Sequence, residues 1–117
     1  MSQDHKVCDM EMALKRMGSN AKLLHEVIGM VREDLPEILE RLRAAVADGD
    51  AALIQREAHS LRGTLVTFDA HAALSEALCL EQLAEAGDLS RAAEMMEHVD
   101  REVARLDTAL VAELKKS

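Results

Sequence analysis

Aromatic residues are almost missing from this sequence of 117 residues, which has no Trp, no Tyr and a single Phe. It also has only five Gly and one Pro, so the chain has few places to turn sharply. Strand-forming aromatic and β-branched residues are scarce, whereas the helix formers Leu, Ala and Met are abundant. We therefore predict an all-α fold, in a chain whose length suits one domain with a single core.

Several classes of protein are disfavoured by what the sequence lacks. A net charge of −8, without clustered Lys and Arg or aromatic stacking platforms, argues against nucleic-acid binding. The N-terminus has no signal-peptide pattern, and charged residues interrupt every apolar run before it reaches membrane-spanning length. Two distant cysteines, Cys8 and Cys79, suggest neither a disulfide framework nor a metal knuckle. We therefore expect a cytoplasmic protein with no membrane insertion.

Apolar residues at helical spacing predict a short first helix over 9–17, with Asp9 as its N-cap. A longer second helix begins at Ser19 or Asn20 and ends in the turn sequence ADGD. Pro36 lies inside the apolar stripe of this second helix. We expect it to kink the helix, with two shorter helices that meet near Leu35 as the alternative.

Three more amphipathic segments complete the predicted fold. The third helix covers 51–67 behind the N-cap Asp50, and the fourth follows Asp69, its expected N-cap. The turn sequence EAGD then ends the fourth helix and begins the last. Long amphipathic helices joined by short turns predict an antiparallel four-helix bundle with an additional short N-terminal helix. We expect one such domain over 1–117, with residues 1–8 flexible.

The third helix carries a histidine and a glycine on its outward face. Its apolar stripe consists of Ile54, Ala58, Leu61, Leu65 and Phe68. Measured from the centre of that stripe at about 100° per residue, His59 lies at about 140° and Gly63 at about 180°. Arg62 lies at about 80° and Val66 at about 120°. Packing does not require glycine at that angle, where alanine would be about 1 kcal/mol more stable, but a partner that approaches the imidazole closely would.

This arrangement suits phosphoryl chemistry. A neutral imidazole is a nucleophile near pH 7, and its ring nitrogen can carry a phosphoryl group. Arg62, one turn beyond His59, can bring its guanidinium to the phosphoryl oxygens. Thr64 could add a hydroxyl, although it points about 80° to the other side of the stripe. From these residues alone, a surface histidine beside an indifferent glycine remains the plainer interpretation.

The segment AHSLRGTLVTFDA resembles the signature of histidine-containing phosphotransfer (HPt) domains. The segment LKRMGSNAKLLHEVIGMVREDLPEILERLRAAVADGD is similar to the first bundle helices of that family, and LEQLAEAGDL is similar to the turn before its last helix. The resemblance covers about 10–115. It implies that His59 accepts a phosphoryl group and that Gly63 leaves the ring accessible. Arg62 stands where the family usually has lysine, and Asp69 stands where it usually has glycine.

The resemblance implies a phosphocarrier in a two-component phosphorelay. The chain would take a phosphoryl group from an aspartate of one receiver domain and pass it to another. Its partners would be response-regulator receiver domains and a hybrid histidine kinase, and it would be a monomer without kinase activity of its own. It would need no cofactor, with Mg²⁺ on the partner receiver. Docking is expected around His59, with Gly63, Thr64 and Val66 at the contact, and the ends Met1 and ELKKS favour a free-standing carrier.

Two alternatives to a phosphocarrier follow from the same residues. A dinuclear metal site in a helical bundle uses Glu-x-x-His motifs, and none of His25, His59, His71 and His98 has Glu three residues before it. We therefore expect no metal site. A non-phosphorylated adaptor bundle that only docks a signalling partner would share every core feature with the carrier. Helical periodicity does not separate the adaptor from the carrier.

Overall fold

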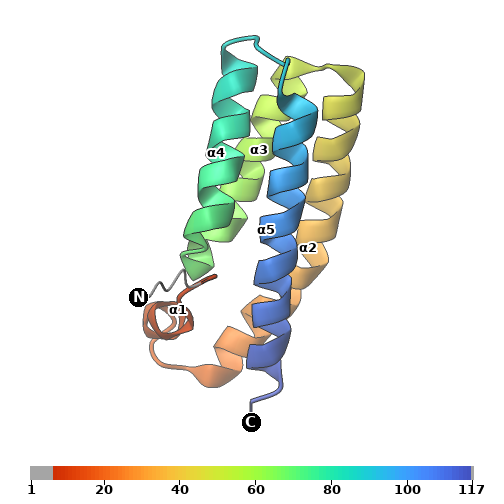
Figure 1. Cartoon of the computed structure of the whole chain (residues 1–117). Helices are drawn as coiled ribbons and strands as arrows, with labels where there is room; N and C mark the ends of the chain where they lie inside the picture. The colour runs from red at the N-terminus through yellow and green to blue at the C-terminus, as the bar shows by residue number, and fades with distance from the viewer. Residues whose placement is uncertain (1–6, 117) are drawn as a thin grey trace, which may run out of the picture.

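Four long helices stand side by side in the computed structural model, which describes residues 7–116 (Figure 1). The elements are α1 (Met10–Arg16), α2 (Ala21–Asp48), α3 (Ala51–Leu65), the 3-10 turn η1 (Val66–Phe68), α4 (His71–Glu85) and α5 (Ala92–Leu114). The helix α1 lies at the end of the bundle where η1 joins α3 to α4. The predicted all-α bundle with a short N-terminal helix is confirmed. Residues 1–6, which make up most of the segment predicted to be flexible, lie outside the described residues.

The predicted N-caps of the first three helices are confirmed. The side chains of Asp9, Asn20 and Asp50 each accept a hydrogen bond from the backbone N–H three residues later, at 3.0–3.1 Å. Gly49 ends α2 in the left-handed region with φ 66°, a conformation that glycine adopts without a steric penalty. These local signals therefore set where α1, α2 and α3 begin and where α2 ends.

The predicted apolar stripes form the core of the bundle. The core residues of α3 and η1 are all fully buried: Ile54, Ala58, Leu61, Leu65 and Phe68. Each long helix packs against two others, in the cyclic order α2, α3, α4, α5. The backbone carbonyl of Phe68 also accepts a hydrogen bond from the N–H of Asp9 at 2.8 Å, which ties the start of α1 to the bundle. The single aromatic side chain therefore lies where α1 joins the bundle core.

The helix α2 continues through Pro36 as one helix, so the alternative of two shorter helices is wrong. Proline removes one backbone donor from a helix, which weakens it locally. On either side of this position, Leu35 and Leu39 are buried in the core. We infer that this packing holds α2 together across the missing hydrogen bond, since tertiary contacts supply most helix stability in proteins.

Asp69 does not cap the fourth helix, contrary to the prediction. The N-cap of α4 is Ala70, which has no side-chain capping bond, and η1 separates α3 from α4. Asp69 adopts a left-handed backbone with φ 49°, and its carboxylate binds Arg16 at 3.1 Å. The guanidinium of Arg16 also donates to the carbonyls of Val66 and Thr67. Asp69 therefore joins the α3–α4 connection to α1, and its positive φ explains why a glycine suits this position.

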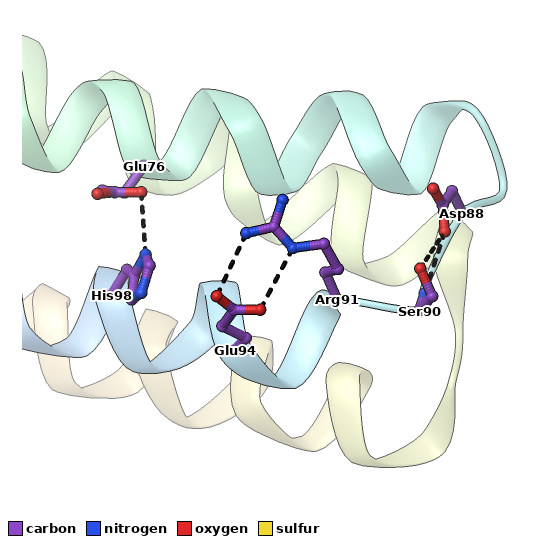
Figure 2. Close-up of polar contacts among 6 residues, drawn as sticks. All are labelled: Glu76, Asp88, Ser90, Arg91, Glu94 and His98. Atoms are coloured by element: carbon purple, nitrogen blue, oxygen red, sulfur yellow. Dashed lines mark hydrogen bonds and ion pairs between the residues drawn. The ribbon is translucent and has the colours of Figure 1, made fainter.

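The last helix begins at Ala92, later than the EAGD turn predicts. Figure 2 shows the reason, because the carboxylate of Asp88 accepts hydrogen bonds from the N–H and the hydroxyl of Ser90. These bonds form a local turn, and they lower the pKa of Asp88. Arg91 then pairs with Glu94 in the first turn of the helix. Side-chain bonds within the connection thus delay the start of α5.

None of the helices described within residues 7–116 has the length and apolarity to cross a membrane.

Candidate functional site

The rotation of α3 about its axis is set by the residues that it buries against the bundle. Glu57 is buried, and its carboxylate accepts a hydrogen bond from Nε of Arg41 on α2 at 3.1 Å. The predicted stripe fills the core on the same side. With these contacts fixed, His59 faces outward and its side chain is 72% exposed. The outward position predicted for His59 is therefore confirmed.

Glu81 of α4 connects His59 to Arg62. Its Oε2 lies 3.3 Å from Nδ1 of His59, and its Oε1 accepts a hydrogen bond from Nη1 of Arg62 at 2.5 Å. The side chain of Glu81 is only 15% exposed, and that of Arg62 is 33% exposed. One carboxylate between α3 and α4 thus brings together the imidazole and the guanidinium that the sequence places on one face of α3.

The contact with Glu81 also distinguishes the two ring nitrogens of His59. An ionised carboxylate accepts hydrogen bonds but cannot donate them. Its contact with Nδ1 of His59 therefore favours the tautomer that carries the proton on Nδ1. In that tautomer Nε2 carries the lone pair. Nε2 has no hydrogen-bond partner within the described part of the chain. The site therefore presents an exposed nucleophilic nitrogen whose opposite side is held by a carboxylate.

Gly63 lies on the exposed face beside His59, as the helical wheel predicts. No neighbouring element approaches within 4 Å of the place where a Cβ at Gly63 would lie. Its backbone is helical, so no positive φ requires glycine there either. Packing among residues 7–116 therefore gives no reason for glycine at this position, which lies on the same exposed face as the imidazole.

Thr64 and Val66 are not part of the cluster formed by His59, Arg62 and Glu81. The hydroxyl of Thr64 points back to the carbonyl of Ser60 in its own helix, at 3.5 Å. Val66 lies in η1 with 51% of its surface exposed. Its position is about two helical turns beyond His59 on the same face, about 10 Å along the axis. Val66 therefore adds apolar surface beside the cluster but no polar contact.

An open hollow borders the imidazole on the side that precedes His59 in the helix. Its lining residues are Ala52, Gln55, Arg56, His59 and Glu81. Its volume is about 340 Å³. Helical side chains lean toward the N-terminal end of their helix, which explains why the ring of His59 borders the turn before it. The free space next to the imidazole therefore lies over Ala52 and Arg56.

Sequence reasoning missed Glu81, although a signal for it exists. The turn between η1 and α4 consists of Asp69 and Ala70, and His59 and Glu81 lie ten residues before it and eleven residues after it. Two antiparallel helices with the same rise per residue place such positions at the same level. The register alone could have paired these two positions. It does not say that Glu81 faces α3, which depends on how α4 is rotated.

The other histidines are placed differently from His59. His98 is half-buried on α5, with its Nδ1 3.6 Å from a carboxylate oxygen of Glu76 on α4 (Figure 2). His25 is half-buried on α2, and His71 is exposed at the start of α4. His5 lies outside the described residues. Over residues 7–116, no group of three or more His, Cys, Asp or Glu side chains could hold a metal ion.

Comparisons with known proteins agree with this geometry. A family model described as "Hpt domain" matches residues 26–109. The crystal structure of histidine-containing phosphotransfer protein B (HptB) from Pseudomonas aeruginosa PAO1 matches with a TM-score of 0.89, over 97% of this chain and 99% of that one. The two sequences are 24% identical, so this second match shows the likeness of the folds. A comparison with curated proteins gives no match.

Proposed function

This chain belongs to the Hpt domain family, and from that premise we propose that it carries a phosphoryl group on His59 in a two-component phosphorelay. The observation that carries the proposal is the imidazole itself. It is exposed, its Nδ1 lies against Glu81, and its Nε2 is without a partner in residues 7–116. Hpt domains carry phosphoryl groups and have no kinase active site of their own, so we infer that the group comes from a partner.

The proposed transfer begins with the Nδ1–H tautomer of His59. The lone pair on Nε2 attacks the phosphorus of an aspartyl phosphate on a receiver domain. The bond from phosphorus to the aspartate oxygen breaks, and the aspartate leaves as a carboxylate with the bonding electron pair. The ring gains positive charge as the new bond forms. The carboxylate of Glu81, hydrogen-bonded to Nδ1–H, offsets that charge in the same way that a buried aspartate supports the histidine of a catalytic triad.

Arg62 is proposed to stabilise the transferred group. Its Nη1 donates to Glu81, but a guanidinium has five N–H donors, so others stay available for phosphoryl oxygens. The lysine usual in the family is a point charge, whereas arginine presents a planar fork. Gly63 would leave room for the receiver, and Thr64 and Val66 would lie at the docking surface. We assign Mg²⁺ to the receiver domain, and no metal or cofactor to this chain.

The proposed partners are response-regulator receiver domains and a hybrid histidine kinase in the cytoplasm, with this chain acting as a monomer. The return step is the same reaction in reverse. A carboxylate oxygen of a second receiver attacks phosphorus, and the bond from phosphorus to Nε2 breaks. One exposed nitrogen can serve both steps, because both partners approach the same open face of α3.

Transfer of radiolabelled phosphoryl from a phosphorylated receiver domain tests the proposal. We expect the chain to take the label, to lose it in acid and to keep it in alkali, as a phosphohistidine does. His59→Gln should abolish labelling, and His71→Gln, which alters an exposed histidine on α4, should not. Receiver phosphate lost only to water would show a docking adaptor instead of a carrier. Label that persists in His59→Gln would show that the site is assigned wrongly.

A further inference from the structure

The hollow beside His59 contains a cation that the proposed mechanism does not use. Arg56 lies one turn before His59 on α3, is exposed, and lines the hollow together with the imidazole. The hollow has about the volume that roughly ten water molecules take up in the liquid. The hollow therefore has room for a phosphoryl group beside the imidazole.

Arg56 differs from most arginines of the chain in its pairing. The arginines that form ion pairs are Arg16, Arg32, Arg41, Arg43, Arg62, Arg91 and Arg105. Within residues 7–116, Arg56 and Arg101 have no carboxylate within 4.0 Å. Carboxylates outnumber cations in this protein, so unpaired guanidinium groups are unusual. One of these two lines the hollow that borders the candidate phosphoryl acceptor.

The charges around the hollow explain what Arg56 could bind. Glu81 also lines the hollow, but its two carboxylate oxygens already contact His59 and Arg62. Asp50 lines a smaller hollow that also borders Arg56 but forms no ion pair with it. The guanidinium of Arg56 therefore keeps its charge and its donors free for an incoming anion.

We propose that Arg56 is a second phosphoryl-binding residue, which holds the oxygens of the group on Nε2 of His59 from the N-terminal side of the hollow. This inference rests on the proposed function of His59. Arg62 and Arg56 would then bind the phosphoryl group from opposite sides. Arg62 approaches it past Glu81, and Arg56 approaches it across the open hollow. The sequence prediction names only Arg62, which lies one turn beyond the histidine and stands where the family usually has lysine.

The titration of the phosphoryl group itself tests this assignment. Phosphoramidate can phosphorylate the whole chain without a partner, since Nε2 attacks phosphorus and the bond to ammonia breaks. The pKa of the bound group is then read from its ³¹P chemical shift. A cation about 6 Å away in a water-like medium favours the dianion, so Arg56→Gln should raise that pKa by about half a unit. The initial rate of phosphorylation should fall about threefold for the same reason.

Arg101→Gln is the matched control, because it removes an equally unpaired guanidinium from α5. We expect it to leave both measurements unchanged, and we expect Arg56→Lys to restore much of the pKa shift. Equal phosphoryl pKa values in Arg56→Gln and Arg101→Gln would overturn the role of Arg56 and leave His59 as the carrier. If neither phosphoramidate nor a phosphorylated receiver transfers a phosphoryl group to the unaltered chain, the proposed function is overturned, and this inference with it.

Discussion

Oε2 of Glu81 lies 3.3 Å from Nδ1 of His59, so a carboxylate from α4 supports the exposed histidine of α3. The same carboxylate binds Arg62, and its limited exposure keeps water from replacing these contacts. The relationship gives the imidazole a preferred tautomer before any partner arrives. It also makes the chemistry of His59 depend on the packing of α3 against α4.

Removing the carboxylate of Glu81 should therefore slow phosphotransfer and change the tautomer of His59. We expect Glu81→Ala to lower the transfer rate about tenfold, the value of one charge-assisted hydrogen bond. Glu81→Gln keeps an acceptor for Nδ1–H but loses the charge, so its rate should be intermediate. The ¹⁵N chemical shifts of the ring report the tautomer. An unchanged Nδ1–H population in Glu81→Ala would contradict this role.

Gly63→Ala should raise the stability of the fold while it slows phosphoryl transfer from a receiver domain. Because a Cβ at this position meets no neighbouring element, the substitution should raise the free energy of unfolding by about 0.5–1 kcal/mol. We expect transfer from a receiver domain to slow, since the added methyl group lies beside the imidazole. Phosphorylation by the small donor phosphoramidate should change little. Urea denaturation and the two transfer rates measure these effects, and equal slowing with both donors would contradict a role in receiver access.

Asp69 offers a test of backbone strain. Its φ of 49° costs a residue with a Cβ about 1 kcal/mol, a penalty that glycine avoids. Asp69→Gly loses the pair with Arg16 but relieves this strain. Asp69→Ala loses the pair and keeps the strain. We therefore expect Asp69→Ala to be about 1 kcal/mol less stable than Asp69→Gly in urea denaturation, and equal stabilities would contradict this account.

The elements that the sequence predicts well are those set by neighbours along the chain. The caps at Asp9, Asn20 and Asp50 act across three residues, and the apolar stripe of α3 follows the helical period. Each of these signals depends only on residues within one or two helical turns of one another. They were sufficient to predict the bundle, its helices and the outward face of His59.

The predictions that failed depend on contacts between distant segments. Asp is a residue type that commonly caps helices, but the carboxylate of Asp69 forms an ion pair with Arg16 of α1, which is distant in sequence. Glu81 is an ordinary surface residue until α4 packs against α3. The continuity of α2 through Pro36 likewise depends on the core around it. A single sequence shows the chemical type of each of these residues, but it does not show which distant residues they contact in the fold.

The turn before α5 gives a prediction about pH. Hydrogen bonds from Ser90 lower the pKa of Asp88, with the larger effect from the side-chain hydroxyl and the smaller from the backbone N–H. A depressed pKa in the folded state means that this contact stabilises the fold above the unfolded pKa and ceases to do so as pH falls through the folded value. Ser90→Ala should raise the pKa of Asp88 toward its ordinary value.

Carboxyl ¹³C titration of Asp88 measures that change, and denaturation at two pH values measures its consequence. The stability difference between Ser90→Ala and the unaltered chain should be present at neutral pH. It should shrink as the pH falls through the lowered pKa of Asp88 in the unaltered chain, below which Asp88 is protonated in both proteins. An Asp88 pKa that is the same in both proteins would show that the hydroxyl is not the cause of the shift.

Val66 gives the test of the docking surface. It lies about 10 Å beyond His59 on the same face, and a half-exposed apolar side chain there suits contact with an apolar helix of a receiver. Val66→Asp should weaken receiver binding about tenfold, because burying a charge at an apolar contact is unfavourable. Ala104→Asp, at an exposed position facing the groove between α2 and α5, is the control with the same change in charge. Phosphorylation by phosphoramidate should be the same in both variants, which would place the Val66 effect in docking and not in the chemistry of His59. Equal receiver affinity for the two variants, measured by titration, would move the docking surface away from Val66.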